Sequence, residues 1–564
     1  MVWSSATCGI FNQILVCVCV CVCVSPVVHT KLGSLKGEYV SVKGKESGVH
    51  AFLGVPFAKP PLGPSLRLAP PQPVEGWEGV RDATQQPPMC MQPKNFALAL
   101  IDKLGVLLAD IPDISEDCLY LNIYTPAKRA NDAKLPVMVW IHGGGLSLGS
   151  ASTYDGSALA AYQEAVVVLI QYRLGLLGFL STGDEHISGN FGLLDQIEAL
   201  KWIQQHIHNF GGDPGSITIF GESAGGVSVS FLLLSPLSVG LFHCAIAESG
   251  TAAMDLLVAN DPLPMAQVAN ASGCSLESTK KFADCMRNLD IDIIVGFTKD
   301  RRLRFPVNVD GHFLTKPVNE LFHKHEFLTI PFMAGINNDE GGWLVPLSWE
   351  EGMDRDQVIK AMSFFYPNSK DAFIRDIIAD EYIGNGEDYV KNRDGFSEVV
   401  ADILFNMPVV KTANAHRDAG APVYLYEYQH SLNFLQNRRP SFVGCDHTDE
   451  IFTVLGFCFT TTHVKLPDVC LEEEEQMSRT MMSYWGNFAR TGLLYCVYLS
   501  VHRSPNGDNL VHWPKYGADE KYLAIGLKKQ VTGQYLKKDR FVFLTQILPQ
   551  KIKQHEENAE HSEL

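Results

Sequence analysis

Short apolar runs rich in β-branched residues alternate with helical patterns between residues 118 and 250. Residues 136–141, 165–170 and 216–220 each predict a buried strand. An amphipathic helix is expected over 193–208, where apolar residues recur three and four positions apart. Strands that are apolar on both faces are typical of parallel sheets covered by helices. The segment therefore predicts an α/β fold with a large, mostly parallel central sheet and helices on both faces.

Composition narrows the class of protein further. The chain has 564 residues, of which 46% are apolar and 19% charged, and this balance excludes a disordered, fibrous or polytopic membrane protein. The net charge of −17 argues against nucleic acid or an anionic membrane surface as the main partner. Residues 327–335 and 422–428 predict further strands, and no repeat or Pro/Gly/Ser-rich linker divides the chain. We expect residues 26–564 to form a single large domain.

Both ends of the chain carry targeting patterns. The apolar run 14–24 is too short to span a bilayer, which takes about 20 residues, but it fits the hydrophobic region of a signal peptide. We expect residues 1–25 to be a signal peptide, an atypical one because no Lys or Arg precedes Lys31 and no small-x-small cleavage site follows. The alternative is a low-complexity artefact at a mis-assigned start.

The last four residues, 561–564, read His-Ser-Glu-Leu, a variant of the endoplasmic reticulum retrieval signals. Together with the N-terminal run, they predict residence in the lumen of the endoplasmic reticulum and a retrieval receptor as a partner. Secretion is the alternative. No transmembrane segment is expected in the mature chain.

The cysteines predict cross-links rather than a metal site. Five of the 14 lie within residues 1–25, and the other nine show neither Cys-x-x-Cys nor zinc-like Cys/His spacing. Cys90 and Cys118 bracket one loop-like stretch, and Cys274 and Cys285 bracket a shorter one. In an oxidising lumen these are candidates for local disulfides, the alternative being nine buried thiols.

The sequence contains two Gly-x-Ser-x-Gly matches, at 221–225 and at 145–149. A nucleophile elbow needs a strand that runs into a sharp turn and then a helix. Ser223 has a predicted strand before it and a small-residue helix start after it, whereas Ser147 follows three glycines that open a loop. We therefore take Ser223 as the nucleophile and Ser147 as a bystander.

His142-Gly143-Gly144-Gly145 directly follows the strand that ends at Ile141, as the oxyanion motif of lipases and esterases does. Without side chains, the backbone N–H groups of Gly143 and Gly144 can approach a substrate oxygen. With the amide of Ala224, they are expected to form a three-donor oxyanion hole.

A serine nucleophile needs a base, and the base needs an orienting acid, in the chain order Ser, Asp or Glu, His. His447 lies in a polar turn before an apolar run, and Glu340 follows a predicted strand. Both are on loops where such folds keep catalytic groups. Asp339 or Asp446 could equally be the acid, and local sequence does not decide among them.

Residues 116–122 (Glu-Asp-Cys-Leu-Tyr-Leu-Asn) and 220–227 resemble the two signature segments of the type-B carboxylesterase/lipase family, and most closely its vertebrate liver-type members. The match runs from about residue 28 to the end through the segments 52–61, 172–175, 189–196, 485–490 and 512–514. The resemblance implies an α/β-hydrolase fold and a Ser223–Glu340–His447 triad. It also implies the disulfides Cys90–Cys118 and Cys274–Cys285.

The resemblance further implies a serine hydrolase that cleaves small to medium carboxylic esters through an acyl-enzyme, with no metal and no organic cofactor. Asn270 begins the one N-glycosylation sequon after the start, so a glycan is expected there. The natural ester, its acyl or alcohol preference, amide or thioester turnover, and the oligomeric state, a homo-oligomer included, stay open.

Three other functions are found on the same fold. Cholinesterases bind a quaternary amine on an aromatic platform in the loop closed by the first disulfide. Between Cys90 and Cys118 the one aromatic residue of this chain is Phe96, which argues against a choline ester as substrate. A retrieval tail is out of place on a bile-salt-dependent lipase. The rival from another class is an inactive adhesion or binding protein, which characteristically loses the nucleophile.

The chain departs from the family pattern at residues 493–503, an apolar insertion that contains Cys496. We expect this insertion to lower folding yield, because apolar β-branched runs favour aggregation, without touching the triad.

Overall fold

The computed structural model describes residues 10–11, 14–15, 25–130, 132–258, 265–297, 299, 303, 305–345, 349–368, 371–490 and 504–562. The predicted signal peptide therefore lies mostly, and the 493–503 insertion entirely, outside the described residues. Residues 10–11 and 14–15 form a short antiparallel pair, β1 (Ile10–Phe11) and β2 (Ile14–Leu15).

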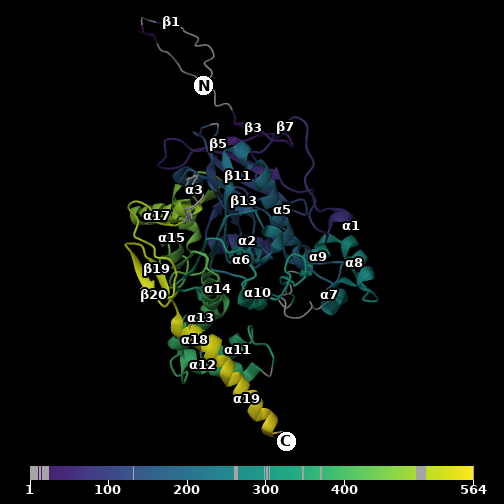
Figure 1. The fold of residues 1–564 in the computed structure, drawn as a ribbon, viewed down its shortest axis with the longest axis vertical. Coiled ribbons are helices and arrows are strands. Elements are labelled where there is room, and N and C mark those ends of the chain that lie inside the picture. The colour runs from purple at the N-terminus through teal and green to yellow at the C-terminus, as the bar shows by residue number, and fades with distance from the viewer. Residues whose placement is uncertain are drawn as a thin grey trace.

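A sheet of eleven strands runs through the described part of the chain (Figure 1). In spatial order its strands are β20 (Gln530–Gln534), β19 (Lys521–Ile525), β17 (Val423–Tyr428), β16 (Phe332–Asn337), β15 (Cys244–Glu248), β14 (Gly212–Glu222), β12 (Leu135–Ile141), β13 (Val166–Ile170), β11 (Tyr120–Pro126), β6 (Val49–Pro56) and β5 (Glu38–Val40). The seven strands from β19 to β13 pair in parallel, and the outer strands pair antiparallel. The predicted α/β class with a mostly parallel sheet is confirmed.

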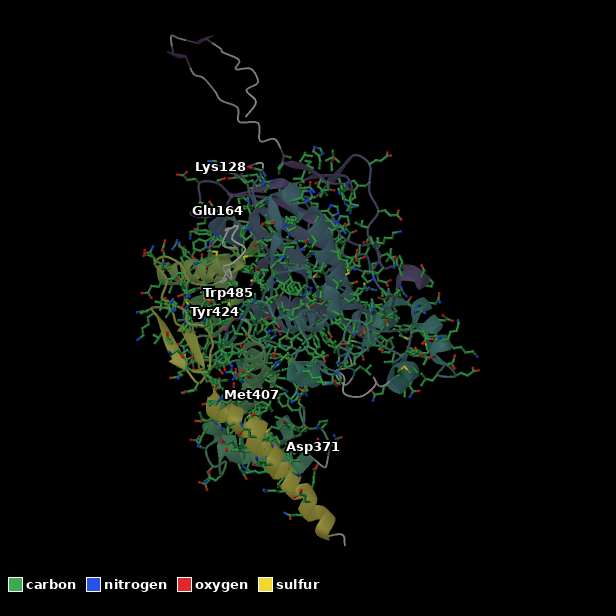
Figure 2. All side chains as sticks on the ribbon, viewed as in Figure 1. Lys128, Glu164, Asp371, Met407, Tyr424 and Trp485 are labelled. Carbon is green, nitrogen blue, oxygen red and sulfur yellow. A yellow bond between two sulfur atoms is a disulfide. The ribbon has the colours of Figure 1, made fainter. Side chains whose placement is uncertain are left out.

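Both faces of this sheet are buried. Along β12, Val137, Val139 and Ile141 pack in one hydrophobic cluster, whereas Met138 and Trp140 pack in a second. Because successive side chains of a strand point to opposite faces, the two clusters lie on opposite sides of the sheet. Helices α5 (Phe191–His206) and α6 (Ala224–Leu234) belong to the first cluster, and α3 (Ser157–Gln163) and α17 (Glu472–Ala489) to the second. Trp485 of α17 and Tyr424 of β17 are buried in that second cluster (Figure 2).

Three small sheets and the other helices surround the central sheet. One small sheet has three strands, in the order β3 (Val27–His29), β4 (Ser34–Lys36) and β7 (Val80–Asp82). The other two are pairs, β8 (Met89–Cys90) with β10 (Ile114–Ser115) and β9 (Leu107–Leu108) with β18 (Val464–Lys465). The helices are α1 (Gly63–Leu66), α2 (Lys94–Leu104), α4 (Gly175–Phe179), α7 (Met265–Ser272), α8 (Thr279–Asn288), α9 (Ile291–Phe297), α10 (Val318–Lys324), α11 (Arg355–Met362), α12 (Ala372–Ile383), α13 (Tyr389–Ala401), α14 (Met407–Asp418), α15 (Asn433–Gln436), α16 (Ile451–Val454), α18 (Lys538–Val542) and α19 (Leu548–Ser562).

Helix α19 extends away from the sheet, with the C-terminus at its tip (Figure 1). Near its middle it contacts α12, where the ring of His555 stacks on Phe373 at 3.8 Å between centroids. The last two residues of the predicted retrieval tail lie outside the described residues. No described helix combines the length and apolar character that a membrane crossing requires.

Two sequence predictions need correction in detail. The strand expected over 327–335 begins only at Phe332, directly after Pro331, which has no N–H to donate to a strand partner. The stretch between Cys90 and Cys118 is not a plain loop, because it contains helix α2.

Three disulfides cross-link the described residues. Cys90–Cys118 and Cys274–Cys285 are the two expected pairs. The third, Cys458–Cys470, was not predicted. It joins the short helix after α16 to the start of α17 and closes the segment that carries β18.

Candidate active site

Ser223 occupies a strained turn between β14 and α6. Its backbone has φ 57° and ψ −125°, a conformation that a residue with a side chain rarely adopts. The glycines on either side make the turn possible, since a Cβ on Gly221 or Gly225 would lie 2.4 or 2.0 Å from the carbonyl oxygen of Ile141. A strained, tightly packed strand–turn–helix is the geometry of a nucleophile elbow.

The predicted oxyanion-hole residues surround Ser223. Gly143 packs directly against it, because a Cβ there would lie 3.1 Å from the Cβ of Ser223. Ala224 is the first residue of α6, where backbone N–H groups have no partner within the helix. Among the hydrogen bonds of the described residues, the amides of Gly143, Gly144 and Ala224 donate to no protein acceptor. These three amides belong to residues that adjoin Ser223 or, for Gly144, line the same cavity as Ser223.

His447 and Glu340 meet at the same end of the sheet. Glu340 Oε2 lies 2.8 Å from His447 Nδ1, and the Glu340 side chain is fully buried. The two alternative acids bind elsewhere. Asp339 accepts from the backbone N–H of Gly444 at 2.7 Å, and Asp446 accepts from the backbone N–H of Trp343 at 3.0 Å. Of the three carboxylates, Glu340 is the one that contacts the imidazole.

The second oxygen of Glu340 is held by two donors. Ser249 Oγ donates to Oε1 at 2.5 Å, and the backbone N–H of Asn337 donates to it at 2.7 Å. Ser249 follows β15 and has φ 48°, so its backbone is also in the left-handed region. These contacts fix the orientation of the carboxylate beneath the imidazole.

The other ring nitrogen of His447 faces Glu222 in this conformation. Nε2 lies 3.1 Å from Glu222 Oε1, and the described hydrogen bonds do not include one from Ser223 Oγ to the imidazole. Catalytic hydrogen bonds of an unliganded site are often formed only when substrate is present. In this conformation, the imidazole therefore contacts Glu340 through Nδ1 and Glu222 through Nε2.

Burial sets the protonation of the site. Removal from water lowers the pKa of His447 to about 4 and raises the pKa of Glu340, because each charged form loses hydration. Lys103 also lowers the pKa of His447, whereas Glu450 opposes the shift. Burial likewise raises the pKa of the neighbouring carboxyls Glu222, Glu248 and Glu450. The imidazole is therefore neutral at pH 7, as a general base must be.

The serine and histidine open into a cavity of about 640 Å³. Aromatic rings flank the histidine there: Trp343 stacks on it at 5.6 Å between centroids, and Phe405 lies at 4.2 Å. Six charged side chains also line the cavity: Asp102, Lys103, Glu222, Arg438, Arg439 and Asp446. Aliphatic side chains and one methionine form the largest group of the remaining wall: Leu100, Leu104, Leu148, Met254, Leu256, Leu257, Val345, Leu404, Leu435 and Val443. Such a wall suits the hydrocarbon portions of an ester.

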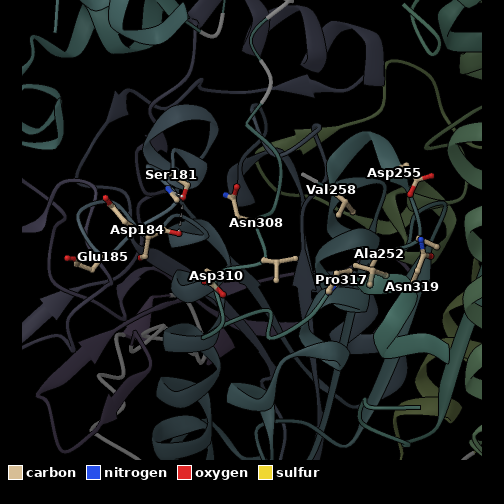
Figure 3. Close-up of a pocket in the computed structure, with 15 residues that line it drawn as sticks. Ser181, Asp184, Glu185, Ala252, Asp255, Val258, Asn308, Asp310, Pro317 and Asn319 are labelled. Atoms are coloured by element: carbon tan, nitrogen blue, oxygen red, sulfur yellow. Dashed lines mark hydrogen bonds between the residues drawn. The ribbon is translucent and has the colours of Figure 1, made fainter. Parts of the chain in front are cut away.

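Figure 3 shows a second hollow, of about 750 Å³, which contains none of the predicted catalytic residues. At its rim Asp184 and Glu185 approach His186, with possible ligand atoms within 4.8 Å of one another, the one such group among the described residues. Asp184 Oδ1 already accepts from Thr182 Oγ1 at 2.5 Å and from the backbone N–H of His186 at 3.0 Å. We assign this hollow no part in the chemistry, since size alone does not supply a nucleophile.

Comparison with known proteins identifies the family of this chain. The model of the carboxylesterase family matches residues 24–544. This chain belongs to the carboxylesterase family. The family membership confirms the resemblance noted in the sequence and the α/β-hydrolase fold. It also confirms that the protein is a serine hydrolase that cleaves carboxylic esters.

Relatives of this carboxylesterase match it over nearly its whole length. Human (Homo sapiens) cocaine esterase is 44% identical over 575 residues, covering 100% of this chain and 98% of the relative. Liver carboxylesterase of Sus scrofa is 43% identical over 565 residues, 96% of each chain. The medium-chain fatty acyl-CoA hydrolase precursor of Anas platyrhynchos is 46% identical over 536 residues, 93% of each chain.

Sequence reasoning missed several residues of the carboxylesterase site. Ser249 and Asn337 both hold Glu340 but belong to no motif that signals such a role. Ser249 follows β15, for which no strand was predicted from the sequence, and Asn337 is the last residue of β16. Glu222 occupies the first variable position of the Gly-x-Ser-x-Gly motif, and nothing else in the sequence singles it out. The Cys458–Cys470 pair had a usable signal, because its separation of 12 residues resembles the 11 between Cys274 and Cys285.

Proposed function

We propose that Ser223, Glu340 and His447 form the catalytic triad of this carboxylesterase. The contact between His447 Nδ1 and Glu340 Oε2 at 2.8 Å, in a cavity that also exposes Ser223, carries the proposal. His447 Nε2 takes the proton of Ser223 as Oγ attacks the ester carbonyl, and Glu340 stabilises the imidazolium that forms. The amides of Gly143, Gly144 and Ala224 donate to the oxyanion.

Collapse of the tetrahedral intermediate releases the alcohol, which takes the proton from His447, and leaves an acyl-serine. Water then attacks the acyl carbon with His447 again as base, and the carboxylic acid leaves. No step of this mechanism requires a metal or an organic cofactor. We infer that residues 26–564 form one catalytic domain, since the strands of the central sheet are drawn from residues 38 to 534.

The substrates we propose are small to medium acyl esters, with xenobiotic and lipid esters included. A cavity of about 640 Å³ in which aliphatic side chains form the largest group supports this range because it offers hydrocarbon contacts without a pattern of polar groups specific for one molecule. The names of the relatives, a cocaine esterase and a fatty acyl-CoA hydrolase among them, are consistent with varied leaving groups.

We further propose that the protein enters the secretory pathway through residues 1–25, stays in the endoplasmic reticulum through its His-Ser-Glu-Leu tail and carries a glycan on Asn270. Two observations support this. The two expected disulfides and a third one are present, and disulfides form in oxidising compartments. Asn270 lies on the surface of α7, where a glycan has room. Its oligomeric state is not part of the proposal.

Expression of the full chain in a secretory host and assay of 4-nitrophenyl acetate and butyrate tests the catalytic assignment. Ser223→Ala should lose at least about 10⁴-fold in kcat. The matched control Ser147→Ala, the second Gly-x-Ser-x-Gly serine, should keep its activity. Equal activity of wild type and Ser223→Ala would reject Ser223 as nucleophile. A folded wild type without activity would leave the binding-protein alternative.

A further inference from the structure

Lys103 stands in the wall of the catalytic cavity. It lies in the last turn of α2 and lines the same cavity as Ser223 and His447. Its Nζ donates to the carbonyl oxygen of Trp343 at 2.7 Å and lies 4.7 Å from the centre of the Trp343 ring. The same ring stacks on His447 at 5.6 Å. One indole thus contacts both the ammonium group and the imidazole.

Lys103 differs from the two other basic side chains of the cavity, because both of those are paired. Arg438 contacts Asp102 at 2.9 Å, and Arg439 contacts the buried carboxylate of Asp449 at 2.7 Å. Among the described residues, Lys103 has no carboxylate within ion-pair distance. An ammonium group has three N–H donors, of which the Trp343 carbonyl takes one. Two donors and a full charge remain without a protein partner.

Lys103 is exposed to solvent where it lines the cavity, so water can serve its two free donors. Partial removal from water lowers the pKa of Lys103, with Arg439 acting in the same direction and Asp446 against it. A bound carboxylate would replace that water and accept charge-assisted hydrogen bonds from Nζ. The aliphatic wall around it accommodates the carbon chain that joins such a carboxylate to the ester.

We propose that this carboxylesterase selects esters that carry a carboxylate at a distance from the scissile bond, and that Lys103 is the specificity-determining residue that binds it. The proposal rests on the triad assigned above. The chemistry is unchanged: water adds across the acyl C–O bond, which breaks to give an acid and an alcohol. The proposal adds one interaction to that mechanism, the binding of the distal carboxylate in the ground state and in the transition state.

A purely structural role for Lys103 makes a different prediction. A cation in the last turn of a helix interacts favourably with the helix dipole, and its contact with the Trp343 ring adds to stability. In that case, substitution lowers stability and affects charged and neutral esters alike. The ratio of kcat/KM for matched esters separates the two roles.

The test uses two matched pairs of esters on the full-length enzyme. The mono-4-nitrophenyl ester of adipic acid is compared with 4-nitrophenyl heptanoate, which places the carboxylate on the acyl side. 4-(Butyryloxy)benzoate is compared with its methyl ester, which places the carboxylate on the alcohol side. The variants are Lys103→Met, Lys103→Arg and Lys103→Glu, with Lys94→Met as control, since Lys94 begins the same helix outside the cavity lining.

In at least one pair, Lys103→Met should lower the charged-to-neutral ratio of kcat/KM about tenfold, with the loss mainly in KM. Lys103→Arg should keep the ratio, Lys103→Glu should lower it further, and Lys94→Met should leave it unchanged. An unchanged ratio in both pairs for Lys103→Met, with neutral esters still hydrolysed, overturns the inference and leaves the triad intact. A wild type that hydrolyses none of the four esters overturns the triad itself.

Discussion

Glu340 Oε2 and His447 Nδ1 lie 2.8 Å apart although 107 positions separate the two residues in the chain. Glu340 follows β16, and His447 lies in the long connection after the neighbouring parallel strand β17. Ser223 directly follows β14 in the same sheet. Because parallel strands all end at one edge, residues that follow different strands meet there, and this is where open α/β sheets hold their ligands.

Replacing Glu340 by Gln keeps the size of the side chain but removes the carboxyl group whose ionised form stabilises the imidazolium. We expect kcat/KM for 4-nitrophenyl butyrate to fall about 10³–10⁴-fold. Asp339→Asn is the matched control, since Asp339 neighbours Glu340 but contacts Gly444 and Ser397 instead of the imidazole. If the Asn variant loses as much as the Gln variant while both stay folded, the acid is misassigned.

The pH dependence of kcat/KM reports the base. His447 acts only when neutral, and burial lowers its pKa to about 4, so activity should stay level from pH 7 down to about 5 and fall below that. Lys103→Met removes a positive neighbour that lowers this pKa, so the acid limb should move to higher pH. Both effects are measured by following kcat/KM for a neutral ester as a function of pH. An acid limb of the wild type near pH 6.5, the ordinary pKa of histidine, would contradict the expected shift.

Gly143→Ala should disable the oxyanion hole. The added Cβ would lie 2.8 Å from the carbonyl oxygen of Glu222 and 3.1 Å from the Cβ of Ser223, so the loop must move away from the nucleophile. Displacing one amide donor costs about 10²–10³-fold in kcat. Gly145→Ala is the control for backbone strain in the same loop, because a Cβ there meets no atom within 4 Å although φ is 61°. Equal kcat values for the two variants would remove Gly143 from the proposed hole.

The unpredicted disulfide should stabilise the fold. Cys458–Cys470 closes a segment of 12 residues, for which loss of the cross-link is worth about 2–3 kcal/mol of unfolding free energy. We expect Cys458→Ser/Cys470→Ser to lower Tm by about as much as Cys274→Ser/Cys285→Ser, whose loop is similar in length. Peptide mapping without reduction tests the pairing directly, and finding the two peptides unlinked would contradict it.

The C-terminal tail should control export. Removing residues 561–564 from the full chain should shift esterase activity from the cell interior to the medium, because the retrieval receptor loses its signal. Immunoblotting of cells and medium measures the shift, and replacement of the four residues by alanines serves as a length-matched control. Equal secretion with and without the tail would favour the alternative of a secreted enzyme.

Features that depend on short stretches of chain were predictable from sequence. The strand into Ser223, the glycines around it and the start of α6 are neighbours in sequence, so residue type and spacing are sufficient to indicate the elbow. The buried strands β12 and β13 were equally clear from continuous apolar runs. The strand expected over 327–335 was misplaced because apolar residues continue across Pro331, and only the proline marks the true start.

Choices between similar groups needed the tertiary structure. Asp339, Glu340 and Asp446 are all acids on loops, and their distance from His447 depends on which strands are neighbours and how each loop turns. The same holds for Lys103, which reads as one more helix-surface lysine until α2 is seen to line the cavity.

The sequence alone determined the α/β class, the nucleophile elbow and the glycine loop, because each is encoded by local pattern and backbone sterics. The tertiary structure decided which acid contacts His447, that Cys458 and Cys470 are also joined, and that Lys103 lines the cavity. Those relationships are contacts between residues far apart in the chain, and they exist only once the sheet order and the packing of the helices bring them together.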